Sequence, residues 1–413
     1  MALERSGTDY LIKQDNSRYQ WYALLLAMLT YGSIAGAARL CMPVLFPDIA
    51  ADLNLDLVAM GTVWGMDPLA GVFLGLPSGM LIDRFGIKRT LTVVCIFAGI
   101  FGAIRGLAAD FTTMSAYMFL FGLMAAVVPS ITPKVTAVWF SGKRLALANG
   151  MLNVAWSLGA VIATLSSATL LAPLLGGWRN VLFVFGVPPF LLGLLWWFTG
   201  REPQRREDVS VIDSGAVPLR ESLSNIIHIK NVWLLCFALM CYWGTNMGFS
   251  GYLPTYLRDI GWTAVRADTA MTLLSGFGAL GVMPLVMLSN RIGSRKLVML
   301  GTIIVMAITV GLIPFVNETG VWVLVVIGGL IRAVPAAIGN TMLFEMKEIG
   351  GKYAGTAIGL TTSLGMIGSF AAPPLGNSLE GSFGSGAPML FWAALAVISI
   401  PIILMMKEPR KTK

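Results

Sequence analysis

Five charged side chains interrupt long apolar stretches of this sequence. They are Arg39, Asp67, Arg105, Lys134 and Arg332. A charge at the centre of a membrane-spanning helix costs about 2.5–3.5 kcal/mol, so it is retained where it faces water, a partner or a ligand. A guanidinium can hold a carboxylate, phosphate or sulfonate through two parallel hydrogen bonds. Arg39 and Arg332, which lie deep in their stretches, are therefore predicted to bind an anion.

Asp67 is the one acid among these charges, and Pro68 follows it. Because proline lacks an amide hydrogen, it leaves a carbonyl free and bends a helix. A carboxylate inside a membrane span beside an arginine can titrate, so Asp67 is the candidate for proton coupling. The alternative is a permanent ion pair between Arg39 and Asp67 that only holds two spans together. Both interpretations stay open at this stage.

Uncharged polar side chains add to the predicted substrate site. Tyr242 and Asn246 stand four residues apart, on one face of a helix, where they can donate hydrogen bonds to a polar ligand. Tyr31 stands eight residues before Arg39 and lies on roughly the same face. Packing alone is the alternative role for Tyr31.

Lys134 and Arg105 lie nearer to the ends of their stretches. Long basic side chains in such positions can snorkel to the membrane surface. Lys134 is also a candidate for substrate binding. With Arg39 and Arg332, it is the third basic residue within an apolar stretch that we consider for this role.

The composition predicts an integral membrane protein. The 413 residues are 56% hydrophobic and only 12% charged, about half the charge of a soluble protein, and the mean hydropathy is +0.77. The four cysteines have no metal-binding spacing, and the sequence contains neither a phosphate-binding loop nor a set of residues for nucleophilic catalysis. We therefore expect no enzyme activity, no cofactor and no metal.

Apolar runs long enough to cross the bilayer as helices predict an all-α membrane protein with twelve spans. The predicted spans are 21–46, 58–80, 90–108, 113–135, 145–171, 178–199, 232–257, 268–288, 297–315, 320–343, 353–375 and 387–406.

The distribution of basic residues predicts the orientation. The connections on the side of both termini hold 22 Lys and Arg residues, whereas the opposite connections hold only Arg179, Arg258 and Arg266. By the positive-inside rule both termini are cytoplasmic. The net charge of +8 is thus mostly a topology signal and needs no nucleic-acid partner. The predicted organisation is an N-terminal tail (1–20), two six-helix bundles (21–199 and 231–406), a linker (200–230) and a C-terminal tail (407–413).

A repeated loop relates the two halves. Gly79-Met80-Leu81-Ile82-Asp83-Arg84-Phe85-Gly86-Ile87-Lys88-Arg89 has a weaker copy, Asn290 to Lys296, at the equivalent point of the second half. The first copy resembles the loop signature of the major facilitator superfamily, G-x-L-x-D-R-x-G-x-K/R-K/R. This resemblance implies a gate on the cytoplasmic side formed by Gly79, Asp83, Arg84, Gly86 and Arg89. It also implies a central cavity lined by spans one, four, seven and ten, which carry Arg39, Lys134 and Arg332.

The basic first span, Pro133-Lys134 and Trp139-Phe140 look most like the anion:cation symporters and the cyanate-type porters of that superfamily. We therefore predict a secondary transporter of a small organic anion, proton-coupled or an exchanger. It is expected to be a monomer in the cell membrane, the inner membrane of a bacterium. The alternatives are an exporter of amphipathic drugs or metabolites, in which Arg39 and Arg332 are structural, and a non-transporting sensor on the same fold.

Overall fold

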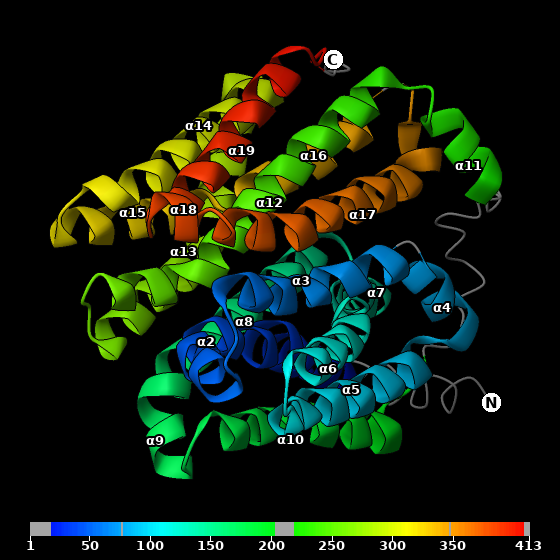
Figure 1. Cartoon of the computed structure of the whole chain (residues 1–413). Helices are drawn as coiled ribbons and strands as arrows, with labels where there is room; N and C mark the ends of the chain where they lie inside the picture. Colours follow the sequence, from blue (N-terminus) through cyan, green and yellow to red (C-terminus); the bar gives the residue numbers. More distant parts are fainter. Residues whose placement is uncertain (1–17, 76, 203–218, 347, 409–413) are drawn as a thin grey trace, which may run out of the picture.

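The computed structural model describes residues 18–75, 77–202, 219–346 and 348–408, and this part of the chain consists of helices and their connections (Figure 1). Eleven of its helices are long and apolar enough to cross a membrane. The remaining predicted span, 353–375, lies within a helix of 28 residues, Gly350–Asn377. Residues 1–17 and 409–413 of the predicted tails and 203–218 of the predicted linker lie outside the described residues.

The first half begins with a continuous helix, Arg18–Leu53, whose centre is a π-helix, η1 (Gly32–Ala38), followed by α2 (Arg39–Leu53). The second span is α3 (Leu57–Leu74), with α4 (Pro77–Phe85) after it. The other elements of this half are α5 (Ile87–Ile104), η2 (Arg105–Leu107), α6 (Phe111–Ala125), α7 (Val128–Trp139), α8 (Gly142–Ser166), η3 (Ser167–Leu171), α9 (Ala172–Leu175) and α10 (Trp178–Thr199).

The second half repeats this order after a short helix, α11 (Leu219–Ile226). Its elements are α12 (Lys230–Asp259), α13 (Ala264–Ile292), α14 (Arg295–Leu312), η4 (Ile313–Phe315), α15 (Glu318–Ile331), α16 (Val334–Glu345), α17 (Gly350–Asn377), α18 (Glu380–Phe383) and α19 (Ala387–Leu404). The fourth span of each half is broken, as α6 and α7 in the first and as α15 and α16 in the second. These bounds confirm the predicted all-helical fold.

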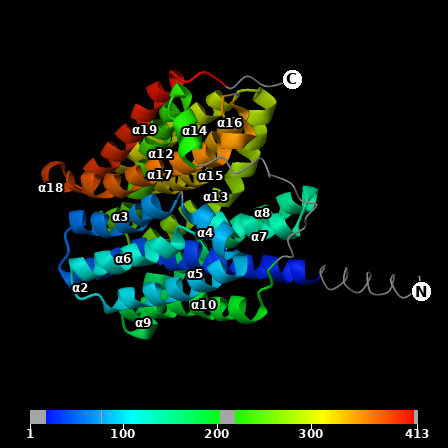
Figure 2. The same cartoon turned by 90° about the vertical axis from the view of Figure 1, so that its right-hand side faces the viewer.

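Each half starts and ends on the same face of the bundle, as an even number of antiparallel spans requires (Figure 2). The Tyr19 hydroxyl donates to the Thr199 carbonyl over 3.1 Å, and the Lys407 N–H donates to the Asn231 side-chain oxygen over 3.3 Å. We call this the termini face. The turns after α2, α12 and α17 lie on the opposite face.

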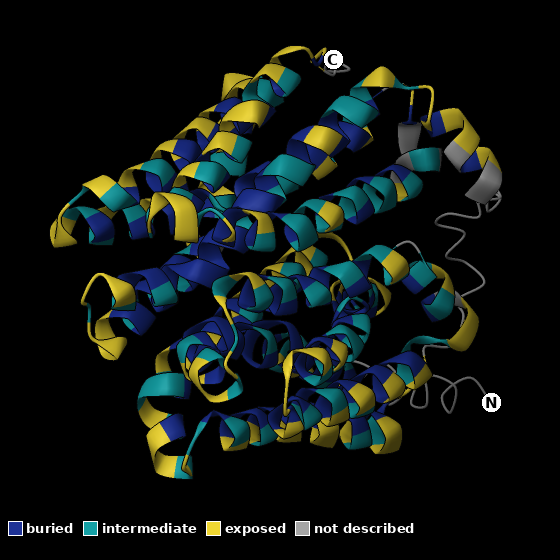
Figure 3. Cartoon of the chain, viewed as in Figure 1, coloured by how far each residue is buried: buried dark blue, intermediate teal, exposed yellow. Residues whose placement is uncertain are grey.

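Small residues let the two halves approach closely along α3 and α17. A Cβ atom on Gly61 would lie 2.9 Å from the Pro373 carbonyl carbon, and one on Gly65 would lie 2.6 Å from the Phe370 carbonyl oxygen. Such contacts are the usual means of packing helices in lipid, where burial of apolar surface gives little driving force. Exposed residues are spread over the outer helices (Figure 3), and many of them are large and apolar, such as Phe198 and Met283. An apolar periphery of this extent fits a lipid environment.

Candidate functional site

Arg39 and Asp67 form an ion pair between α2 and α3. The Arg39 Nε contacts the Asp67 Oδ2, and the side chains are 26% and 4% exposed. Among the described residues, the terminal nitrogens of Arg39 have no protein hydrogen-bond partner. The pair is therefore compatible with both predicted roles of Arg39, because one edge of the guanidinium holds Asp67 while the other stays available to a ligand.

The π-helix η1 places Arg39 at its end. Helices of this type are rare and are frequently found at functional sites. Two of its carbonyls accept hydrogen bonds from side chains of other helices: Ala35 from the Trp156 indole over 3.1 Å, and Ala38 from the Arg105 guanidinium over 2.8 Å. These bonds fix the backbone on both sides of the turn that precedes Arg39.

Arg105 is a buried structural residue, and the expectation that it snorkels is wrong. Its side chain is fully buried, donates to the Gly102 carbonyl over 3.0 Å, and stacks 4.2 Å from the centre of the Phe121 ring. Backbone carbonyls and an aromatic face compensate the charge, which is how a buried cation without a carboxylate partner is held. Its position at the end of its apolar run did not reveal this.

Arg332 lies in the break between α15 and α16. Tyr242 is buried and donates from its hydroxyl to the Arg332 carbonyl over 3.0 Å, which holds the broken backbone against α12. The Arg332 Nη1 is buried and has no hydrogen-bond partner among the described residues. Arg39 and Arg332 stand one in each half, and each has guanidinium nitrogens without a hydrogen-bond partner among the described residues. Such groups can bind an anion through charge-assisted hydrogen bonds.

A proline follows a short turn in the fourth span of each half. Pro129 and Pro335 occupy the first turn of α7 and α16. Proline is tolerated there because its missing N–H would have no partner in a regular helix. The backbone stays helical through the turn between α6 and α7, so this span is one helix with a local distortion.

The remaining predicted substrate residues lie in different places: Tyr31 near Arg39, Asn246 near Tyr242, and Lys134 beside Gly79. Tyr31 is half-buried in the turn before η1 and lies within electrostatic range of Arg39. Asn246 is half-buried and donates to the Tyr242 carbonyl over 3.1 Å. The Lys134 Nζ donates to the Gly79 carbonyl over 3.4 Å, which places it against the predicted gating loop.

The gating loop joins α4 to α5 on the termini face. Gly86 has φ = 82°, a backbone conformation that favours glycine, and this turn starts α5. Arg84 and Arg89 are exposed, and no atom lies within 4 Å of a Cβ built on Gly79. The side chain of Asp83 lies outside the described part of the structure. The predicted gating role of these residues stays a prediction.

A glutamate caps this turn in both halves, which the sequence reasoning missed. The Lys88 N–H donates to Glu202 over 2.9 Å, and the Ser294 hydroxyl donates to Glu408 over 2.9 Å. A carboxylate at the start of a helix is favoured by the free N–H groups and the helix dipole. The matching tripeptides Arg201-Glu202-Pro203 and Lys407-Glu408-Pro409 are the signal that could have revealed them.

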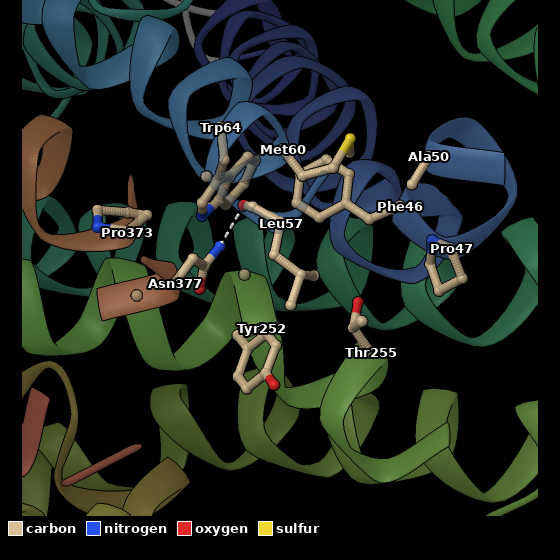
Figure 4. A pocket seen from close by; sticks show the side chains of 13 residues that line it. Phe46, Pro47, Ala50, Leu57, Met60, Trp64, Tyr252, Thr255, Pro373 and Asn377 are labelled. Atoms are coloured by element: carbon tan, nitrogen blue, oxygen red, sulfur yellow. Dashed lines mark hydrogen bonds between the residues drawn. The ribbon is translucent and has the colours of Figure 1, made fainter. Parts of the chain in front are cut away.

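A small cavity of about 30 Å³ lies between the halves near the opposite face (Figure 4). The Trp64 indole donates to the Met247 carbonyl over 3.0 Å at its wall, and the Asn377 amide donates to the Leu57 carbonyl over 2.7 Å. The cavity has room for about one water molecule. It is therefore too small for an organic anion. We call the contact between the two halves at this face, which includes the Trp64–Met247 and Asn377–Leu57 hydrogen bonds, the seam.

Comparison with known proteins identifies the family. The family model described as Major Facilitator Superfamily matches residues 24–373 and 235–413. The chain is 30% identical over 203 residues, 46% of its length, to a probable galactarate/D-glucarate transporter, GudP, of Bacillus subtilis, and it spans 43% of that protein. It is 26% identical over 94% of both chains to a cis,cis-muconate transport protein of Acinetobacter baylyi.

A solved structure supports the fold. The crystal structure of a bacterial homologue of the human lysosomal transporter Spinster, inward-facing and unoccupied, superposes with a TM-score of 0.78 at 18% identity. The superposition covers 94% of this chain and 97% of that one. At this identity the likeness concerns the arrangement of the helices alone.

Proposed function

Because this chain belongs to the Major Facilitator Superfamily, we propose that it is a secondary transporter of a small organic anion, a carboxylate or sulfonate. The carboxylates named for its relatives, galactarate, D-glucarate and cis,cis-muconate, support this substrate class. The observation that carries the proposal is that each half supplies one arginine with guanidinium nitrogens that have no hydrogen-bond partner among the described residues, Arg39 at its terminal nitrogens and Arg332 at its Nη1.

Alternating access is the mechanism that this arrangement supports best. An anion held between Arg39 and Arg332 contacts both halves, so rocking of one half against the other alternately opens the site to each face. The inter-half bonds of Trp64 and Asn377 lie near the opposite face. With both termini in the cytoplasm of a bacterial cell, that face is external, and the arrangement corresponds to a transporter closed on its outer side.

Proton coupling is assigned to Asp67 in this proposal. When Asp67 is ionised, it neutralises Arg39 through the ion pair. When it is protonated, the full charge of Arg39 is available to the anion. Binding of the proton and binding of the anion therefore favour each other, which is the linkage that symport requires.

Uptake by purified protein in proteoliposomes tests the substrate class. The panel contains carboxylates, sulfonates, inorganic anions and cationic amphipathic drugs. A charge-assisted hydrogen bond contributes about 1.5–3 kcal/mol, so Arg39→Gln and Arg332→Gln are each expected to lower uptake of the preferred anion about 10- to 100-fold. Arg266→Gln is the control, because Arg266 pairs with Glu318 on the surface over 2.8 Å.

Uptake of no anion, or unchanged uptake by both arginine variants, excludes the anion site. Drug uptake that survives both variants supports the exporter alternative instead. The orientation of the protein in the vesicle membrane is determined separately by protease digestion of the linker, so that import is distinguished from export.

A further inference from the structure

Arg258 connects the two halves near the opposite face. Its Nη2 donates to the Asp268 Oδ1 of α13 over 2.8 Å and to the Val44 carbonyl of α2 over 3.1 Å. One guanidinium therefore joins the first span of one half to two spans of the other. Breaking the ion pair leaves Arg258 free to withdraw from Val44.

The ion pair is buried and incompletely satisfied. The side chain of Asp268 is 1% exposed and that of Arg258 is 16% exposed. The Asp268 Oδ2 and the Arg258 Nε are buried and have no hydrogen-bond partner among the described residues. Burial of an ionised carboxylate is costly unless its oxygens are all paired, so this carboxylate is poorly compensated and accepts a proton readily.

The surroundings of Asp268 contain few other charges. Arg258 of α12 and Asp48 of α2 are the charged groups that act on it electrostatically. Its neighbour on α8 is the uncharged Thr164, which bonds Thr272 one turn further along α13. Other charged groups on the helices packed against α13 lie at helix ends and are Lys143, Arg144, Lys230, Asp259, Arg295, Lys296, Glu318 and Glu345. Asp48 repels the Asp268 carboxylate and favours its protonation.

We propose that Asp268 is a proton-binding site, separate from Asp67, that controls closure of the seam on the opposite face. A proton from water binds the Asp268 carboxylate and forms an O–H bond. The neutral acid no longer attracts Arg258, the bond from Arg258 to Val44 weakens, and the seam opens. This rests on the proposed function only for the identification of that face as external. Acidity on that side then favours the state that receives substrate from outside.

Chemical labelling of the seam tests the proposal without substrate. All four native cysteines are replaced, and Thr255, which lines the small cavity, becomes the reporter as Thr255→Cys. Reaction with a membrane-impermeant maleimide is measured in oriented proteoliposomes at external pH 8 and pH 5. The exposed Thr112→Cys, on the same face, corrects for the change of thiol reactivity with pH. Because no transport is measured, failure of the proposed function does not affect the result.

The corrected labelling rate is expected to rise about tenfold from pH 8 to pH 5, the shift that follows loss of one charge-assisted hydrogen bond. Asp268→Asn is expected to label rapidly at both pH values. Asp52→Asn is the control, because Asp52 pairs with Arg179 over 2.8 Å within the first half, and it keeps the pH response.

A corrected rate that does not change with pH in the parent protein overturns the proposal, even if Asp268→Asn fails to fold. A pH response that survives in Asp268→Asn also overturns it. Loss of the response in Asp48→Asn but not in Asp268→Asn assigns the proton to Asp48 and equally contradicts the proposal.

Discussion

At the residue scale, the geometry of Arg39 is compatible with both of the roles that the sequence presented as alternatives. Its Nε holds Asp67, and its terminal nitrogens face no protein acceptor among the described residues. An arginine can do this because its five donors form a rigid fork, whereas a lysine presents one point charge. In the proposed mechanism, an internal carboxylate and a ligand carboxylate therefore compete for a single side chain.

Asp67→Asn is expected to separate binding from coupling. The neutral amide leaves Arg39 permanently free, so anion binding persists, and uptake no longer increases when an inward proton gradient is imposed. Uptake with and without the gradient measures this, with Asp52→Asn as the control for loss of an acid outside the site. A normal response to the gradient in Asp67→Asn removes this residue from the proton path.

Individual site residues were predictable where a charge interrupted an apolar run, because burial of a charge needs a physical reason. Arg39, Asp67 and Arg332 were found in this way. Arg258 and Asp268 were missed, because they lie within one or two turns of helix ends, where a charge in the sequence looks like part of a loop. Only the packing of the two halves shows that they are buried.

At the element scale, the spans followed from their apolar length, but their irregularities did not. The predicted span 178–199 coincides with α10 (Trp178–Thr199), whereas the predicted span 21–46 continues to Leu53 and contains η1. In a π-helix each backbone hydrogen bond spans five residues instead of four. This change leaves the apolar composition as it is, so hydropathy cannot reveal it. The bonds from Trp156 and Arg105 that satisfy its carbonyls come from distant parts of the chain.

Because η1 packs closely against α8, adding one methyl group at their contact is expected to destabilise the protein. A Cβ on Gly159 would lie 2.0 Å from the Gly32 carbonyl oxygen, so Gly159→Ala must push the two helices apart. Overpacking of this kind costs about 1–3 kcal/mol, and we expect a lower thermal unfolding midpoint in detergent and reduced anion uptake.

Gly150→Ala on the same helix is the matched control. No atom lies within 4 Å of a Cβ built on Gly150, so this variant is expected to keep the parent midpoint or to exceed it slightly, since alanine favours a helix. Equal midpoints for the two variants would show that α8 and η1 are not held at this distance.

At the scale of the whole molecule, two bundles meet along a seam whose hydrogen bonds, within the described ranges of the chain, are few and near one face. The indole of Trp64 bonds the second half at Met247, and the amide of Asn377 bonds the first half at Leu57. Two rigid bodies joined by a small number of separable bonds can exchange between closed and open states at modest cost.

Trp64→Phe is expected to shift this exchange toward opening. It leaves the buried Met247 carbonyl without its donor in the closed state, at a cost of about 1–3 kcal/mol, so labelling of the Thr255→Cys reporter rises at least about fivefold. Trp233→Phe is the control, because its indole donates over 2.8 Å to Ile227 within the second half. Equal labelling of the two variants contradicts a sealing role for Trp64.

The sequence predicted the two-fold plan of the molecule from the repeated loop, but it did not show what holds the repeat together. Glu202 and Glu408 cap the same turn in both halves and connect it to the chain that follows the last span of each. The substrate role of residues on different spans stays a prediction. How those spans pack against one another is set by long-range contacts, which no local pattern contains.

The π-helix between Gly32 and Ala38 makes the site depend on backbone winding as well as on chemistry. A π-turn accommodates one more residue than an α-turn, and each residue of an α-helix turns the chain by about 100°. Rewinding this segment as a regular α-helix of the same length would therefore rotate everything before it, Tyr31 included, by about 100° relative to Arg39. Such a change would rearrange the residues around Arg39 while every side chain of the protein stayed the same.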